Sequence, residues 1–270
     1  MDPLEGRPLK ALTRRQAERF VTDGYVVIPE VFPRETAEKL LPLVWDRLPE
    51  DPEDRSTWQR AGTVLQEMIE GPAVEAMFTR RYVDALDDLL GEKRRVGPMK
   101  ALGFLPIRFA GFAEPPWTPP EKGWHLDGNH FHHRLFSPEQ AAVGIELLTD
   151  IDPGGGGTAV KPGSHRYAAR VLADAEPAGL AVRELNPPVH RATAHLEGVE
   201  LTGRAGDVVV MHPHLVHAAS ANTRSRVRII GNRGLRLHEP MRIDRENPAE
   251  HSLVELAIRF ALDEREPAAV

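Results

Sequence analysis

Helical and strand patterns of hydrophobic residues follow one another near the amino terminus. Thr13 and Gln16 have the spacing of a capping box, in which each side chain bonds to the backbone of the other residue. Apolar residues then recur three or four positions apart, and this pattern ends at Gly24. A β-branched run follows and is closed by Pro29. We therefore predict a helix up to Gly24 and a strand over residues 25–28.

Helical spacing of apolar residues marks three later segments. A second helix is predicted after Pro33, where apolar residues recur at positions 37, 40, 41 and 44. The region from Thr57 to Leu90 is predicted to be mostly helical for the same reason. A final helical pattern covers residues 252–261, after Pro248.

From Leu102 onward, short apolar runs are separated by proline, glycine and asparagine. This pattern is typical of a β-sandwich or barrel. The proline-dense residues 115–120 predict an extended, exposed loop. The predicted strands are residues 103–109, 143–149, 158–160, 207–212 and 227–232.

The chain shows no internal repeat and no change of composition that would mark a linker. We therefore expect one domain over residues 1–270, a length at which β proteins often form a single domain. Within it we expect a helical part at about 12–95, a β core at about 96–240 and a carboxy-terminal helix at about 250–262.

Composition excludes several classes of function. Hydrophobic residues make up 41% and charged residues 27%, which is ordinary for a globular protein. The net charge of −6 gives no electrostatic footprint for nucleic acid. The absence of cysteine excludes disulfides, thiolate nucleophiles and iron–sulfur clusters. No apolar stretch is long enough to span a membrane, so we expect a cytoplasmic protein without membrane contact.

Two histidines and one carboxylate carry the strongest chemical signal. His125 and Asp127 are two positions apart, which places both side chains on one face of an extended segment. A distant His217 completes a set that can occupy one face of an octahedral metal and leave the other positions open, as in non-haem iron(II) oxygenases. The pair alone is weak evidence, because a histidine and an aspartate can also share an exposed loop.

The segment around the distal histidine offers three imidazoles and two guanidinium groups. Pro213 lies between His212 and His214, which argues against those two histidines forming a ligand pair. Arg226 and Arg228 fall on one face of the next predicted strand. An arginine there suggests a planar cationic group that grips a carboxylate through two parallel hydrogen bonds.

Several motifs in the same order resemble the phytanoyl-CoA dioxygenase family of iron(II)- and 2-oxoglutarate-dependent oxygenases. The resemblance spans nearly the whole chain. The motifs are residues 20–29, His125-Leu126-Asp127, Pro162-Gly163-Ser164-His165, Gly206-Asp207, and His217 followed by Asn222 and Arg228.

The resemblance implies a site and a fold. It makes His125, Asp127 and His217 the ligands of iron(II), and Arg228 the residue that binds the distal carboxylate of 2-oxoglutarate. Arg226 is the competitor for that role. It also implies a mixed α and β, mainly β fold: a double-stranded β-helix, the jelly-roll or cupin-like core, with helices of the amino-terminal part packed beside it.

The resemblance also implies an activity. Dioxygen and 2-oxoglutarate would be consumed to hydroxylate an unactivated C–H bond of a small molecule, with desaturation, epoxidation or cyclisation by the same iron chemistry as alternatives. A carboxylate at Asp127 disfavours halogenation, in which chloride takes that position.

Arginine outnumbers lysine, which suggests a GC-rich bacterial genome and a hypothetical role in natural-product biosynthesis. We expect a monomer or homodimer. The other hypotheses are a non-catalytic ligand-binding jelly roll and a zinc hydrolase with the same ligands.

The chain departs from the family pattern at two places. Family members often carry serine two residues after the distal histidine, whereas this chain has Ala219 followed by Ser220. Ser220 is therefore a secondary candidate for holding 2-oxoglutarate. Arg108 is another, because the resemblance places it on a strand that runs toward the metal region. The second departure is a glycine run, Pro153 followed by four glycines at residues 154–157, in place of a more usual Asn-Gly turn. No Lys-Ser or Lys-Thr follows it, so we interpret it as a flexible hairpin turn rather than a phosphate loop.

A histidine-rich segment follows the metal pair. His130, His132, His133 and Arg134 are candidates for substrate contact, with a partly exposed loop as an equally good interpretation. His165 belongs to a turn motif that we interpret as structural.

Overall fold

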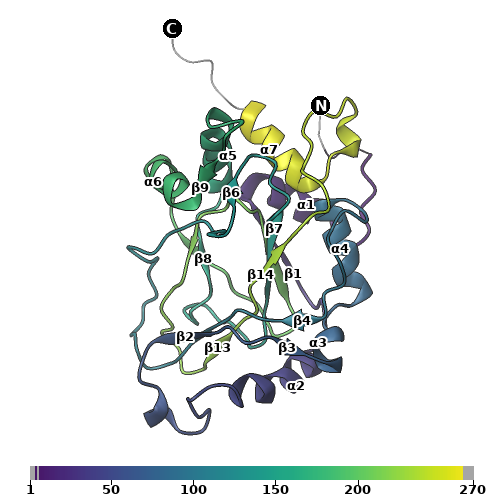
Figure 1. Ribbon diagram of the computed structural model, residues 1–270. Coiled ribbons are helices and arrows are strands. Elements are labelled where there is room, and N and C mark those ends of the chain that lie inside the picture. The colour runs from purple at the N-terminus through teal and green to yellow at the C-terminus, as the bar shows by residue number, and fades with distance from the viewer. Residues whose placement is uncertain (1–3, 5, 264–270) are drawn as a thin grey trace.

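Helices and short strands alternate along this computed structural model, which describes residue 4 and residues 6–263 (Figure 1). Helix α1 spans Arg14–Asp23, and the capping box between Thr13 and Gln16 is present. Gly24 ends this helix in the left-handed conformation, which suits glycine. Strand β1, Tyr25–Ile28, follows directly. The helix and the strand predicted for this region are thus confirmed.

The segment between the second helix and Leu90 is less helical than its spacing suggests. Helix α2, Arg34–Trp45, is confirmed. The prediction of a mostly helical region over residues 57–90 is wrong in part, because the segment pairs with the β core. A 3-10 turn precedes two strands and two helices there: η1 Arg55–Thr57, β2 Gly62–Leu65, β3 Ile69–Glu70, α3 Pro72–Glu75 and α4 Arg80–Leu90.

A four-stranded antiparallel sheet crosses the middle of the molecule in the order β1-β11-β7-β14. Its two central strands, β11 and β7, pair directly, with Val209 opposite Ile145. Strand β1 pairs with β11 on one side, so the amino-terminal strand belongs to the core. The other strands of this sheet are β11 Val208–Met211, β7 Ala142–Glu146 and β14 Arg233–Leu235.

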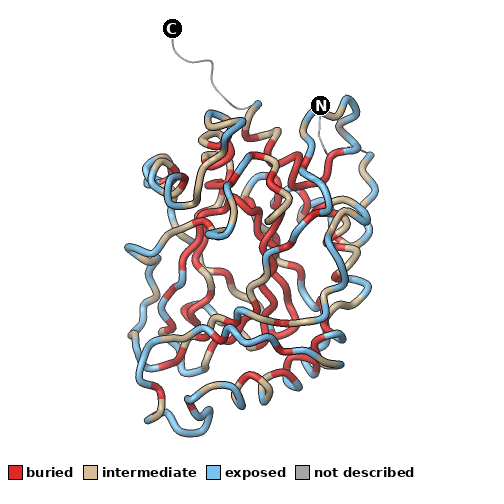
Figure 2. Tube along the Cα trace, in the orientation of Figure 1, coloured by how far each residue is buried: buried red, intermediate tan, exposed pale blue. Residues whose placement is uncertain are grey.

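The two faces of this sheet pack against different partners, because side chains of a strand alternate between its faces. Val208 and Val210 belong to the large hydrophobic cluster that includes the helices. Val209 and Met211 belong to a second cluster, which we call the inner hydrophobic cluster. It also contains Val160 and other residues of the opposing strands. A sheet covered on both faces explains why β7 and β11 are buried along their whole length (Figure 2).

Four smaller sheets complete the strand pattern. Two have three strands, in the orders β10-β8-β12 and β13-β5-β2, and two are the pairs β3-β4 and β6-β9. Their remaining strands are β4 Ala101–Leu102, β5 Leu105–Arg108, β6 His132–His133, β8 Ala159–Val160, β9 Leu180–Ala181, β10 Val199–Glu200, β12 His217–Ala218 and β13 Arg228–Ile229.

The mainly β prediction is confirmed only in part. The fold is mixed, and the strands of residues 6–263 do not join into one continuous barrel. Two helices of the predicted β core were missed: α5, Ser164–Asp174, and α6, Val182–Ala192. Proline at positions 187 and 188 lies inside α6, where this residue normally ends a helix. The carboxy-terminal helix, α7, spans Leu253–Asp263 and is confirmed, and a 3-10 turn, η2, spans Pro248–Glu250 before it.

The helices lie around the strands on several sides (Figure 1). Helices α1, α5 and α7 pack on one another at one end of the molecule, and α2 lies at the opposite end beyond β2 and β13. Within the described part of the chain, no helix has the length and apolar character needed to cross a membrane. Strand β12 pairs with β8 and carries His217, so these strands position part of the candidate site.

Candidate metal centre

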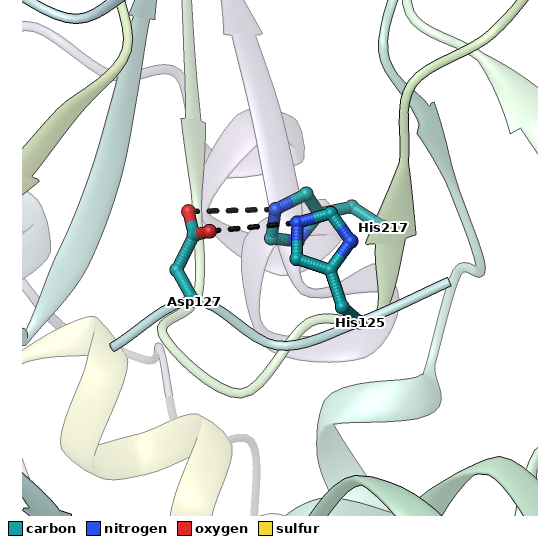
Figure 3. A group of neighbouring side chains, drawn as sticks. All are labelled: His125, Asp127 and His217. Carbon is teal, nitrogen blue, oxygen red and sulfur yellow. Dashed lines mark ion pairs between the residues drawn. The ribbon is translucent and has the colours of Figure 1, made fainter. Parts of the chain in front are cut away.

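His125, Asp127 and His217 come together although 90 residues separate the last two (Figure 3). Each residue offers a ligand atom, and these atoms all lie within 4.8 Å of one another. The Nε2 atom of His125 is 3.5 Å from Oδ1 of Asp127, and Nε2 of His217 is 3.4 Å from Oδ2. The carboxylate thus faces both imidazoles, one through each oxygen.

Backbone carbonyls orient both imidazole rings. The Nδ1 of His125 is 2.8 Å from the carbonyl oxygen of Gly123, and the Nδ1 of His217 is 3.0 Å from that of Leu215. A carbonyl can only accept, so each Nδ1 donates its proton, and the lone pair of each Nε2 is free to bind a metal. Both Nε2 atoms are the ones that face Asp127.

The backbone also brings the two histidines side by side. His125 and His217 form an isolated antiparallel bridge, with N–H to carbonyl distances of 2.8 and 3.0 Å. On its other side His217 pairs with Val160 of β8. Direct cross-strand partners share one face of a sheet, so His217 lies on the side of the inner hydrophobic cluster. Asn186 of α6 accepts the N–H of Leu126 at 2.9 Å and fixes the segment between His125 and Asp127.

The charges of the cluster support one another. Burial acts to raise the pKa of Asp127, but hydrogen bonds and charge from His125 and His217 outweigh it and hold that pKa far below its usual value. The hydrogen bond to Asp127 raises the pKa of His125, although burial opposes the shift.

The donor set fits a divalent metal ion. Ligand atoms that bind one ion at about 2.1 Å lie within roughly 4.2 Å of one another, and both histidine–aspartate pairs satisfy this limit. Two neutral imidazoles and one carboxylate on one side of an ion are the facial arrangement of non-haem iron(II) oxygenases. Asp127 is 28% exposed and His125 43% exposed at the side chain, so the opposite side of such an ion would be open.

A buried arginine lies in the neighbouring sheet. Arg228 on β13 is only 2% exposed, and its Nε and Nη1 donate to the carbonyls of Gly156 and Pro106 at 2.7 and 2.9 Å. Within residues 6–263, no carboxylate forms an ion pair with it. Burial, together with the charge of Arg108, lowers the pKa of Arg228 to about 9. This guanidinium is therefore a buried cation without a paired anion.

Arg108 is the direct cross-strand neighbour of Arg228. The two side chains therefore lie on one face of the sheet. Burial lowers the pKa of Arg108 as well. A side chain at Gly62, its other neighbour, would collide with Arg108, so this glycine gives the guanidinium its room.

The two remaining candidates for the carboxylate site have other partners. The side chain of Arg226 is 71% exposed and lies 3.5 Å from Asp150, so the shared face predicted for Arg226 and Arg228 does not bring Arg226 into the interior. Ser220 is buried, donates to the carbonyl of Gly157 at 2.6 Å and accepts from the Trp117 indole at 3.1 Å. Arg228 thus stays the stronger prediction.

The histidine-rich segment lies mostly at the surface. His130 and His132 are exposed, and Arg134 forms an ion pair with Glu176 at 2.8 Å, so the exposed-loop interpretation fits these residues better than substrate contact. His133, the third histidine of this segment, is buried and bonds to the carbonyl of Gly128 at 3.0 Å.

The other histidines of the sequence motifs form a separate cluster. His165 and His214 each lie beside His212, with ring centroids 4.9 and 5.0 Å apart, and all three are buried. The expectation that His212 is not a ligand is consistent with this packing. His165 lies in the first turn of α5, in agreement with a structural role.

A residue that fixes the metal segment was missed. Asn186 has no local motif, because its role depends on a backbone group 60 residues away. Gly62 could have been noticed only as a glycine inside a strand, which often marks the close approach of another group.

Comparison with known proteins finds both relatives in sequence and solved structures with a similar fold. A 25% identical relative is an ectoine dioxygenase from Stutzerimonas stutzeri (strain A1501), matched over 232 residues, which cover 81% of this chain and 74% of the relative. Among solved structures, the non-haem α-ketoglutarate-dependent carbocyclase SnoK has a TM-score of 0.53 at 19% identity, with 87% of this chain and 89% of that chain covered.

A second solved structure extends the likeness in fold. The epimerase SnoN, in complex with Fe³⁺, α-ketoglutarate and nogalamycin RO, has a TM-score of 0.52 at 20% identity, covering 83% of this chain and 82% of that chain. The model of the family described as phytanoyl-CoA dioxygenase (PhyH) matches residues 20–230, which contain His125, Asp127, His217 and Arg228. The chain therefore belongs to the phytanoyl-CoA dioxygenase family.

Proposed function

We propose that this protein is an iron(II)- and 2-oxoglutarate-dependent oxygenase that hydroxylates an unactivated C–H bond of a small molecule. The observation that carries the proposal is the convergence of His125, Asp127 and His217, with both Nε2 atoms directed at the carboxylate. Family membership and the fold shared with such enzymes support it.

The three ligands would hold iron(II) by one face. The Gly123 and Leu215 carbonyls fix the tautomers, so both imidazoles present a lone pair. Asp127 adds the negative charge that offsets part of the charge of the ion. When bound, the iron with 2-oxoglutarate and dioxygen supplies the oxidising chemistry, in which the co-substrate loses carbon dioxide and becomes succinate.

Arg228 is proposed to bind the distal carboxylate of 2-oxoglutarate. A buried guanidinium has a large desolvation cost, and a carboxylate that pairs with it through two hydrogen bonds offsets this cost. Arg108 lies beside Arg228 and adds positive charge to the same face of the sheet. Ser220 has only its remaining lone pair to offer, since its proton goes to Gly157.

The fold of the proposed enzyme is a distorted jelly roll. We infer that the sheet β1-β11-β7-β14 and the sheet β10-β8-β12 are its two halves, because the inner hydrophobic cluster joins them. His217 faces this interior, and the exposed side of His125 faces the opening through which a substrate would enter.

The outcome of the oxidation is a finer proposal. Hydroxylation is our first choice because the ligand set includes Asp127, whose carboxylate occupies the position that a halide would need. Desaturation, epoxidation or cyclisation by the same iron chemistry are the alternatives, and the carbocyclase named above is an example of cyclisation on a similar fold. Nogalamycin RO in the epimerase structure is consistent with a small-molecule substrate, and we propose natural-product biosynthesis as the context.

Succinate formation tests the proposal. Purified protein, stripped of metal, is supplied with 2-oxoglutarate and dioxygen, either with iron(II) or with zinc(II). We expect slow succinate formation with iron(II) alone, stimulated by a suitable substrate from a panel of small molecules. Hydrolysis of a panel substrate with zinc(II) and without 2-oxoglutarate would instead support the hydrolase hypothesis. A wild-type protein that forms no succinate with iron(II) and any substrate of the panel would contradict the proposal.

A further inference from the structure

The glycine run at residues 154–157 encloses the carboxylate of Glu200. The N–H groups of Gly154, Gly156 and Gly157 donate to the two side-chain oxygens of Glu200 at 2.6, 2.9 and 2.9 Å. Successive backbone N–H groups that converge in this way form an anion-binding nest. The nest is filled by a side chain of the protein itself, which explains why this glycine run needs no phosphate.

The carbonyl side of the same loop faces the distal segment of the chain. The carbonyl of Gly156 accepts from Nε of Arg228 at 2.7 Å, and that of Gly157 accepts from Ser220 at 2.6 Å. The carbonyl of Gly154 accepts from the N–H of Thr223 at 2.7 Å. The loop is therefore bonded on both sides, by partners that the interpretation as a flexible hairpin turn did not include.

One peptide group connects an anion with a cation. The N–H of Gly157 donates to Glu200, and the carbonyl of the same peptide group, that of Gly156, accepts from Arg228. We call this arrangement the Glu200–peptide–Arg228 bridge. Hydrogen bonds in a chain polarise one another, so the carboxylate strengthens the acceptor that holds the guanidinium.

We propose that Glu200 is a positioning residue for the 2-oxoglutarate site, acting through the Gly156–Gly157 peptide to fix the guanidinium of Arg228. This inference rests on the proposed function, since it assigns Arg228 to the co-substrate carboxylate. It adds a residue from β10, a strand that carries none of the proposed ligands.

The glycines are required by the close approach of the loop to its neighbours. Gly156 has a φ of 78°, and a Cβ there would lie 2.9 Å from Cβ of Asn222. A Cβ at Gly157 would overlap the backbone carbonyl of Leu201. The glycine run therefore lets the backbone lie between Glu200 and Arg228, which larger residues would prevent.

Arg228 needs this support for an electrostatic reason. Its side chain is buried next to the like charge of Arg108, and both effects oppose its ionised form. The negative charge of Glu200 acts in the opposite direction. In the absence of a co-substrate, the bridge thus keeps a buried cation in one orientation, ready for a carboxylate.

Three variants separate the role of charge from that of space filling. Glu200→Gln keeps the size of the side chain and removes its charge, whereas Glu200→Asp keeps the charge and shortens the reach. Glu197→Gln, on an exposed residue of the same segment, is the matched control. Each protein is titrated anaerobically with iron(II) alone and then with 2-oxoglutarate, and amide hydrogen exchange of residues 154–157 is followed without either ligand.

If Glu200 acts through its charge, Glu200→Gln binds 2-oxoglutarate on the order of tenfold more weakly, the size expected when one member of a hydrogen-bond network is lost. Glu200→Asp then falls between wild type and Glu200→Gln. Iron(II) affinity stays unchanged, exchange in the loop becomes faster in Glu200→Gln, and Glu197→Gln matches wild type.

Three results would overturn the inference. Equal 2-oxoglutarate affinity of wild type and Glu200→Gln would refute it while leaving the proposed function intact. An affinity of Glu200→Asp below that of Glu200→Gln would show that Glu200 only fills space. A wild type that binds iron(II) but no 2-oxoglutarate would refute the proposed function first, and the positioning role with it.

Discussion

At the scale of single residues, the metal centre depends on which nitrogen of each imidazole carries the proton. The carbonyls of Gly123 and Leu215 make that choice, and they are backbone groups that no substitution removes. The carboxylate is the replaceable part of the site. Asp127 contacts His125 and His217, and it is partly exposed, so its loss should leave the fold intact.

We predict that Asp127→Ala binds iron(II) more than about a hundredfold more weakly, since even residues that only support a ligand cost about 10- to 100-fold. Equilibrium dialysis under anaerobic conditions measures the affinity, and circular dichroism checks the fold. Glu121→Ala, which removes an exposed acid of the preceding loop, is the control and should match wild type. Iron affinity within tenfold of wild type would reject Asp127 as a ligand.

The two arginines of the β13 region are distinguished by their burial. Arg228→Ala should raise the KM for 2-oxoglutarate by about thirtyfold or more, because it removes the buried partner of a charged pair. Arg226→Ala should leave the KM within twofold of wild type, since its side chain is exposed and paired with Asp150. Steady-state kinetics with 2-oxoglutarate as the varied substrate compares them, and the reverse ranking would transfer the role to Arg226.

At the scale of elements, one buried carboxylate adds a polar link to the apolar packing of helix α7. Glu255 accepts both terminal nitrogens of Arg94, at 2.6 and 2.9 Å, and the backbone N–H of Ser252 at 2.8 Å. Glu255 is fully buried and Arg94 is only partly exposed. The pair connects the segment after α4 with the amino-terminal end of α7.

We predict that Glu255→Gln lowers the free energy of unfolding by about 3 kcal/mol, the lower end for breaking a buried pair because Arg94 is partly exposed to solvent. Urea unfolding followed by circular dichroism measures the change. Glu250→Gln, at an exposed residue of η2 just before the helix, should have an effect close to zero. A loss below 1 kcal/mol would mean that packing alone holds α7.

Elements with a strong local signal could be predicted, and those decided by distant partners could not. The capping box at Thr13 and the left-handed Gly24 fixed the ends of α1. By contrast, residues 62–65 have apolar residues at a spacing compatible with a helix, and they form β2 because β5 lies beside them. Helix α6 was missed because its two prolines argue against a helix, although its remaining residues pack one apolar face.

At the scale of the whole molecule, three buried histidines join several elements. His165 of α5 and His214 both lie beside His212, in the connection between β11 and β12, and Phe20 of α1 packs on His212 with ring centroids 6.2 Å apart. Burial lowers the pKa of His165 and of His214 to about 3, and that of His212 well below its usual value of 6.5. The folded protein therefore keeps these imidazoles neutral.

The unfolded chain protonates these histidines more readily than the folded protein does. The free energy of unfolding should therefore be highest above pH 6.5 and decrease as the pH falls toward 3. Each histidine contributes up to about 1.4 kcal/mol per pH unit in that window. Urea unfolding between pH 7.5 and 5, with a chelator present, measures the slope. His214→Leu should reduce it, and His238→Gln, at an exposed position, should not. A free energy of unfolding that is constant over this range would contradict the argument.

The candidate site could be predicted only in its chemistry, and not in its geometry. The spacing of His125 and Asp127 indicates a shared face, but nothing in the sequence places His217 beside them, and the order of the family motifs supplied that connection. Glu200 had no such motif, because the nest it fills lies 43 residues away. Long-range pairing of strands places both His217 and Glu200, and the local pattern of residues does not encode this pairing.

Anaerobic titration of the purified protein with iron(II) and then 2-oxoglutarate tests the central claim most directly. Wild type should bind one iron and one 2-oxoglutarate per chain and develop the visible charge-transfer absorption of the iron chelate. Asp127→Ala should show no such absorption at the same concentrations. A wild-type protein that takes up neither iron(II) nor 2-oxoglutarate, with its fold intact, would contradict the assignment of His125, Asp127 and His217 as an iron site.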